Sequence, residues 1–200
     1  AQRVSGSFQG ALSAAQRLAA LEMDKDVGRE IPEPAKLELA LAAIKAKKYA
    51  FAEYYLVELR KSANSKIKAG AMNAIGVIAL KDGRVPEAMT AFEEALKAVP
   101  DYEAAHINRG FLALRYADYN TAKDSLNGMQ KDWYATSGLA IAERLSGNAD
   151  NAERLCDKAM SGGEKSKQVL FNCAIVAYQG KGDYQKAKSL LQKIVKLQSS

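Results

Sequence analysis

A recurring six-residue pattern limits the fold of this chain more than any other feature of its sequence. Each copy opens with a residue suited to a turn, continues through an aromatic or small residue, and ends in an alanine. These marker alanines are Ala11, Ala52, Ala88, Ala122, Ala152 and Ala187, at successive spacings of 41, 36, 34, 30 and 35 residues. A period near 34 residues is the sequence signature of a solenoid built from stacked helical units.

The stretch Ala69–Tyr102 shows one unit most clearly, as two amphipathic helices joined by a tight turn. Apolar or small residues recur every three or four positions in both halves, namely at Met72, Ile75, Ile78 and Ala79, and then at Ala88, Phe92, Ala95 and Leu96. Asp82-Gly83 ends the first half, because glycine readily adopts the left-handed conformation found after a helix. Pro86 suits the start of the second helix, and Pro100 suits its end.

This unit resembles the tetratricopeptide repeat, a 34-residue helix–turn–helix. The resemblance depends on Gly76, Gly83, Ala88, Phe92, Ala95 and Pro100, which occur at the spacing of that family. It implies an all-α fold, a right-handed α-solenoid in which the first helices line a concave face. It also implies a protein-binding function rather than catalysis.

We expect five such repeats, over 33–66, 69–102, 103–131, 132–166 and 168–200. Segment 1–32 is expected to hold an N-terminal helix, either a half repeat or a cap, followed by a charged loop. In the last repeat we expect Phe171, Ala174, Ile175 and Tyr178 to face Ala187, Leu191 and Ile194. The small residues Gly76 and Gly110 are expected where neighbouring helices approach closely.

The composition favours a single repeat array with a solvated surface. The net charge is +6, and lysine alternates with acidic residues on the predicted outer faces, which disfavours a nucleic-acid footprint. No run of about 18 apolar residues predicts a membrane span, and no signal peptide is visible at the start. A bacterial periplasm or envelope and a cytoplasm are both compatible with this sequence.

Residues suited to catalysis are few. The single histidine, His106, is predicted to point into its helix pair, and no nucleotide-binding motif follows a predicted strand. Cys156 and Cys173 lack metal-ligand spacing. They are expected on neighbouring helices, where they are either bridged or, as we favour, two buried thiols. We expect no enzyme activity, no cofactor, no metal and no small-molecule substrate.

The predicted concave face carries two apolar rows edged by amides. The candidate partner-binding residues are Asn73, Val77, Leu80, Asn108, Phe111, Leu114, Ile141, Arg144, Asn172 and Val176, and Leu41 and Ile44 continue the rows in the first repeat. Such a surface suits an extended peptide or an amphipathic helix. The alternative is that these side chains pack against neighbouring first helices. A carboxylate clamp, which the family uses in some members, lacks its basic residues here.

The sequence therefore predicts a scaffold or adaptor that recognises a protein partner, and the alanine-rich repeats resemble those of bacterial envelope or motility assemblies. One alternative is a structural component that self-assembles through its repeat ends. A further alternative is RNA binding through the lysine-rich stretches 60–68 and 181–196. That alternative is weaker, because helical RNA readers carry polar residues where this chain has Leu, Val and Phe.

Overall fold

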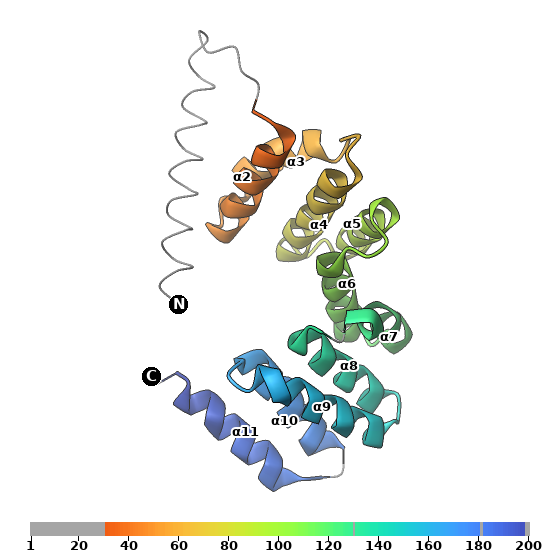
Figure 1. The fold of residues 1–200 in the computed structure, drawn as a ribbon, viewed down its shortest axis with the longest axis vertical. Helices are drawn as coiled ribbons and strands as arrows, with labels where there is room; N and C mark the ends of the chain where they lie inside the picture. The colour runs from red at the N-terminus through yellow and green to blue at the C-terminus, as the bar shows by residue number, and fades with distance from the viewer. Residues whose placement is uncertain (1–30, 130, 181, 199–200) are drawn as a thin grey trace. The chain divides into compact units, whose positions relative to one another are not determined.

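A computed structural model describes residues 31–129, 131–180 and 182–198, and all their regular elements are helical (Figure 1). The elements are α2 (Glu33–Lys45), α3 (Tyr49–Leu59), α4 (Ser65–Lys81), α5 (Val85–Ala98), α6 (Glu103–Arg115), α7 (Tyr119–Leu126), a 3-10 turn (Asn127–Met129), α8 (Trp133–Leu145), α9 (Ala149–Gly163), α10 (Lys167–Gln179) and α11 (Tyr184–Lys196). The chain divides into two compact units, unit 1 up to Ala105 and unit 2 from His106. The expected all-α class of helical hairpins is confirmed for the described residues.

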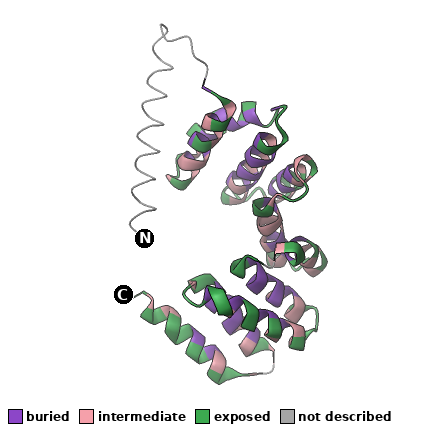
Figure 2. Cartoon of the chain, in the orientation of Figure 1, coloured by how far each residue is buried: buried purple, intermediate pink, exposed green. Residues whose placement is uncertain are grey.

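Unit 1 contains the hairpins α2/α3 and α4/α5, which share a core of aliphatic side chains and alanines. Leu56, Leu59 and Ile78 are almost completely buried in it. A smaller cluster around Ala69, Ala95 and Ala105 continues the core. In Figure 2, buried and exposed residues alternate along these helices. The amphipathic stripes read from the sequence are therefore the surfaces on which the hairpins pack.

Unit 2 has one continuous core that runs through α7, α8, α9, α10 and part of α11. The most buried large side chains are Leu126, Val169 and Leu170, with Cys173 beside them. First helices contact each other directly here, since α8 packs on α10 as well as on its hairpin partner α9. Each hairpin is thus stabilised by the next one along the chain, as in other solenoids.

Two glycines sit where a second helix comes too close for any side chain. A Cβ atom on Gly110 would lie 2.5 Å from Cγ of Leu126, and one on Gly76 would overlap the ring of Phe92. Both large residues come from the second helix of the same hairpin and are fully buried. The close approach expected at Gly76 and Gly110 is therefore observed.

The five turns between the helices of each hairpin share one backbone conformation. The residue five positions before each marker alanine has a positive φ, with values of 59° at Lys47, 75° at Gly83, 60° at Ala117, 92° at Gly147 and 69° at Gly182. Glycine adopts this conformation without strain, which explains three of the five residues. The other two hairpins adopt the same turn with Lys47 and Ala117. The positive φ is therefore required by the geometry of the hairpin, whichever residue occupies the position.

Side-chain caps define where several helices begin. The carboxylate of Asp132 accepts a hydrogen bond from the backbone N–H of Ala135 at 2.7 Å, and that of Asp183 accepts one from Lys186 at 2.9 Å. Asn64, Asp118 and Ser166 cap α4, α7 and α10 in the same way. Such caps satisfy N–H groups that have no partner within the helix.

The element bounds differ from the expected repeat bounds at two places. Helix α4 begins at Ser65, four residues before the expected start of the second repeat at Ala69. Helix α7 has only eight residues and passes into the 3-10 turn, which accounts for the short spacing of the third repeat. The helix and loop expected over 1–32 lie outside the described residues, except for Ile31 and Pro32.

One expectation about the last hairpin is wrong. Phe171, Tyr178 and Leu191 were expected to face inward, but they are 52%, 59% and 44% exposed. Ala187, by contrast, is buried as expected. The physical reason is that the apolar stripe on each of these helices is wider than the surface that α10 and α11 bury against each other. No other described helix covers the rest of the stripe.

Candidate functional site

In unit 1 the predicted binding residues lie on α4, beside the first helix of the preceding hairpin. Val77 and Leu80 are half-buried, whereas Asn73 is buried at 8% exposure. Leu41 and Ile44 on α2 are also half-buried and pack against the core. Because α2 and α4 contact each other, these apolar side chains belong to one side-by-side pair of first helices.

In unit 2 the predicted row begins with Asn108, Phe111 and Leu114 on α6, all of which are half-buried. The ring of Phe111 stacks on Tyr134 of α8, with centroids 4.1 Å apart and planes only 9° apart. Its edge also lies where a Cβ on Gly138 would fall, at 2.6 Å. Phe111 therefore already has a close partner within unit 2.

The remaining predicted residues connect α8 to α10. The amide of Asn172 donates to Ser137 Oγ at 2.9 Å, and Ser137 donates in turn to the carbonyl of Tyr134 at 2.7 Å. Near the C-terminal ends of the same two helices, Arg144 Nε donates a hydrogen bond to the backbone carbonyl of Gln179 at 2.6 Å. These polar contacts bring the two first helices together across a separation of 35 residues.

Between these polar contacts lie the apolar members of the same set. Val176 is buried at 4% exposure, and Ile141 is half-buried against the core. The candidate residues of unit 2 thus lie on three successive first helices, α6, α8 and α10. The structure places Asn172 and Val176 inside the packing, and leaves Phe111, Leu114 and Ile141 partly accessible. Their role in partner binding stays a prediction.

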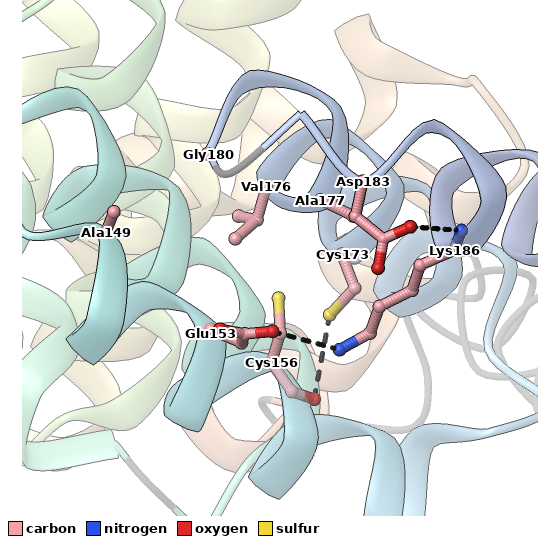
Figure 3. Close-up of a pocket in the computed structure, with 9 residues that line it drawn as sticks. All are labelled: Ala149, Glu153, Cys156, Cys173, Val176, Ala177, Gly180, Asp183 and Lys186. Atoms are coloured by element: carbon pink, nitrogen blue, oxygen red, sulfur yellow. Dashed lines mark hydrogen bonds and ion pairs between the residues drawn. The ribbon is translucent and has the colours of Figure 1, made fainter.

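A small cavity lies beside the two cysteines, where α9, α10 and α11 meet (Figure 3). Its volume is about 20 Å³, close to the space that one water molecule needs. The cavity is lined by Ala149, Glu153, Cys156, Cys173, Val176, Ala177, Gly180, Asp183 and Lys186. It is too small for a substrate or a cofactor.

The chemistry of the two thiols is that of buried structural cysteines. Both are free, and the Sγ of Cys173 donates to the carbonyl of Cys156 at 3.7 Å. The neighbouring thiol of Cys173 and burial together raise the pKa of Cys156 well above its ordinary value. A thiol with a raised pKa stays protonated at neutral pH and is a poor nucleophile. The structure therefore agrees with the buried-thiol interpretation and not with a bridge.

Lys186 is the basic residue that lines this cavity. Its Nζ lies 3.1 Å from Asp157 Oδ1 and 3.8 Å from Glu153 Oε1, both on α9. Burial opposes its charged form, but the hydrogen bond to Asp157 and the two carboxylates raise the pKa of Lys186 overall. This arrangement stabilises a cation that ties α11 to α9, and it does not activate an amine.

Two further absences hold for residues 31–129, 131–180 and 182–198. Within them, no group of three or more His, Cys, Asp or Glu side chains is arranged to hold a metal ion. No helix among them is long and apolar enough to cross a membrane. His106 is half-buried at the start of α6.

Sequence reasoning missed one group of exposed apolar residues. Phe51, Tyr54 and Val57 lie on α3 and are 40%, 74% and 54% exposed. The signal was available, because the same positions of the other second helices hold mostly polar residues.

Comparisons with known proteins give a fold but no closer relation. No family model matches the chain, and no curated protein matches its sequence. MamA from Desulfovibrio magneticus has a similar structure, with a TM-score of 0.65 and 17% identity over 84% of this chain and 95% of that one. YrrB, described as a tetratricopeptide protein with an unusual peptide-binding site, has a TM-score of 0.64 and 17% identity over 92% of both chains.

A third similar structure is a tetratricopeptide repeat protein from Parabacteroides merdae. Its TM-score is 0.68 at 15% identity, over 96% of this chain and 80% of that one. At such low identity the likeness concerns the fold alone. The helical hairpins, the close helix approaches at Gly76 and Gly110 (the glycine seams) and these matches together lead to one conclusion: this chain has the fold of the tetratricopeptide-repeat proteins.

Proposed function

We propose that this protein is a non-catalytic scaffold that binds a protein partner through the apolar side chains of its first helices. The observation that carries the proposal is the row on α2 and α4. Leu41 and Ile44 on α2, and Val77 and Leu80 on α4, are all half-buried rather than buried. Half-buried apolar side chains on two adjacent helices offer surface to an extended peptide or an amphipathic helix.

The similar structures support this proposal. YrrB has the same fold over 92% of this chain and is described as having a peptide-binding site. Within unit 2, the partly accessible residues Phe111, Leu114 and Ile141 form a second candidate surface of their own. The buried candidates Asn172 and Val176 would then act by holding α10 in place. A role in a bacterial envelope or motility assembly remains part of the proposal, and two of the similar structures come from named bacteria.

Two charge insertions test the proposal. Val77→Glu with Leu80→Glu alters unit 1, and Phe111→Glu with Leu114→Glu alters unit 2. The matched control is Tyr116→Glu, because Tyr116 is 55% exposed, follows the last residue of α6 and lies outside the rows.

Partners captured by the wild-type protein would be identified by quantitative mass spectrometry. We expect their recovery to fall at least tenfold with one of the double variants and to be unchanged with the control. Circular dichroism must show that helical content persists. Equal recovery with both double variants and the wild type would overturn the proposal.

A second candidate function is self-assembly, and the last hairpin favours it. Phe171, Tyr178, Tyr184, Leu191 and Val195 are each at least 44% exposed. Stacking of two copies on this face would cover these side chains. Sedimentation of the purified protein without any partner is the test. Concentration-dependent association that is lost in Leu191→Glu with Val195→Glu would support it, whereas a monomer at all concentrations would exclude it.

A further inference from the structure

The outward face of α3 differs from that of every other second helix in the described chain. Three equivalent positions of each second helix show the difference: one residue before the marker alanine, two residues after it and five residues after it. In α3 these positions hold Phe51, Tyr54 and Val57. The equivalent residues are Glu87, Thr90 and Glu93 in α5, Thr121, Asp124 and Asn127 after α6, Asn151, Arg154 and Asp157 in α9, and Lys186, Ser189 and Gln192 in α11. Four hairpins thus show that the fold itself requires no apolar residue at these positions.

The three apolar side chains on α3 form a firm, solvent-facing patch. Phe51 and Tyr54 are 40% and 74% exposed, and Val57 is 54% exposed. Both rings rest edge-on against the buried ring of Tyr55, with centroid distances of 5.4 Å and 5.2 Å. Contact with Tyr55 restricts the motion of the two exposed rings, which reduces the conformational entropy that they lose when they bind another surface.

Basic residues flank this patch at both ends of α3. Between Lys45 and Lys68 the chain has seven lysines and arginines and two glutamates, a net charge of +5 in a chain whose total is +6. Lys47 and Lys48 precede α3, while Arg60 and Lys61 follow it, and all four are exposed. None of these four has an ion-pair partner among the described residues.

The acidic groups near the patch are engaged by other residues. Glu58 Oε1 forms an ion pair with Lys36 Nζ at 2.9 Å, and Glu53 forms one with Arg84 at 3.9 Å. Beside Tyr54 and Val57 opens a hollow of about 520 Å³ that Glu33, Glu58 and Lys61 also line. Glu33 accepts a hydrogen bond from Ser62 at 2.6 Å. The charge that this face offers to a partner is therefore positive.

We propose that the outer face of α3 docks onto an anionic lipid surface. In this arrangement α3 lies parallel to the membrane, Phe51, Tyr54 and Val57 enter the interface, and the basic residues at both helix ends contact acidic headgroups. Aromatic rings favour the membrane interface, and each nearby lysine or arginine strengthens binding to an anionic surface about fivefold. The docking is peripheral and needs no spanning helix.

Other occupants fit these observations less well. A second copy would bring two basic faces together, which like charges oppose. A stable protein–protein interface needs a continuous apolar centre. On α3 only three apolar side chains are exposed, and charged residues lie directly beside them. Single-stranded RNA would meet the basic ends and could stack on the rings. The aliphatic Val57, which is 54% exposed, offers a base no aromatic face on which to stack, whereas it can enter a membrane interface together with the rings.

Vesicle co-sedimentation of the full chain tests the proposal. The probes are vesicles of phosphatidylcholine alone and of phosphatidylcholine with about 30% phosphatidylserine, which carries the anionic headgroup. We expect the partition coefficient to be at least tenfold larger for the anionic vesicles and to fall as the salt concentration rises. Equal partition into both vesicle types, or no partition into either, would overturn the proposal. So would binding of a single-stranded RNA that prevents vesicle binding at equal concentration, because it would identify RNA as the better ligand.

Two double variants separate the roles of the patch and its charged ends. Phe51→Asn with Tyr54→Ser introduces residues that α9 and α11 carry at the same positions, so the hairpin should still fold. Lys48→Glu with Lys61→Glu reverses one charge at each end. The aromatic double variant is expected to lower anionic partition about tenfold. The charge-reversal variant is expected to lower it at least ~25-fold, because the loss of each of its two lysines alone costs about fivefold. The matched control, Lys188→Glu with Lys193→Glu, makes the same charge change on exposed sites of α11 and should leave partition within about twofold.

A fluorescent label reports whether the patch itself enters the interface. Tyr54→Cys and Thr90→Cys place an environment-sensitive dye at equivalent positions of α3 and α5, while the native cysteines are at most 3% exposed. We expect a blue shift on anionic vesicles for the dye on α3 and none for the dye on α5. The same shift at both positions would show that the membrane contact does not involve this face and would overturn the proposal.

Discussion

The hairpins α4/α5 and α10/α11 follow the same sequence pattern but differ in how completely they are packed. Phe92 in α5 and Leu191 in α11 both lie four residues after a marker alanine. Phe92 is 0% exposed, whereas Leu191 is 44% exposed. At the matching position of the first helix, α4 has Gly76 against the Phe92 ring, and α10 has the half-buried Ile175. The pattern therefore specifies the hairpin, and its burial depends on what packs around it.

The largest expected effect tests this difference directly. Phe92→Ala should lower the free energy of unfolding by about 3–5 kcal/mol, because it leaves a cavity in a close-packed core. Leu191→Ala should cost less than about 1 kcal/mol, because much of that side chain already contacts solvent. Denaturant unfolding followed by circular dichroism measures both values. Equal costs would show that the two hairpins are packed alike.

A smaller effect is expected from filling the glycine seam of α4. Gly76→Ala places a methyl group on the buried Phe92 ring and should cost about 1–3 kcal/mol. Gly128→Ala is the control, because a Cβ there meets no atom within 4 Å. The control should be neutral or stabilising by about 0.5 kcal/mol. If both substitutions had the same effect in chemical denaturation, the close approach at Gly76 would be refuted.

The two hairpins also begin their second helices differently. Helix α11 has the capping carboxylate of Asp183, whereas α5 has no side-chain cap and carries Pro86 in its first turn. Because only Ala187 and Leu190 of α11 are buried, the cap contributes a larger share of its stability. Asp183→Ala should cost about 1 kcal/mol, and Asp183→Asn, which keeps an acceptor, only a few tenths. Thermal unfolding of the three proteins gives the comparison, and equal melting temperatures would argue against the cap.

The smallest expected effect concerns the ion pairs of Lys186. Lys186→Met should cost about 0.2–1 kcal/mol at low salt and less at high salt, as for other partly exposed pairs. The pKa of Lys186 is raised in the folded protein, so its contribution is fully present below the unfolded pKa of about 10.4. It is lost as the pH rises through the higher folded pKa. Unfolding at several pH values should show a constant difference up to pH ~9 that narrows above it.

Most of the hairpin architecture could be predicted because it depends on local rules. The marker alanines predicted five hairpins, and Gly76 and Gly110 predicted where helices approach closely. The turn at Ala117 shows a limit, since an alanine with a φ of 60° has no signature in a single sequence. The hairpin needs the left-handed turn there whichever residue occupies it.

The candidate site was less predictable than the fold. Register placed Phe111 in an apolar row and Asn172 one turn before the rows, but it did not show that Phe111 stacks on Tyr134 or that Asn172 donates to Ser137. Those contacts depend on the distance between first helices of successive repeats, which periodicity does not specify. The aromatic face of α3 could have been found by comparing equivalent outer positions.

The sequence by itself determined the helical periodicity, the turn positions and the glycine seams, since each depends on a few neighbouring residues and their steric limits. Only the tertiary structure decided which apolar stripes are covered, which polar groups join α8 to α10, and that Phe51, Tyr54 and Val57 remain in solvent. The physical reason is that burial is a property of two surfaces. A stripe on one helix becomes core only where another part of the molecule packs against it.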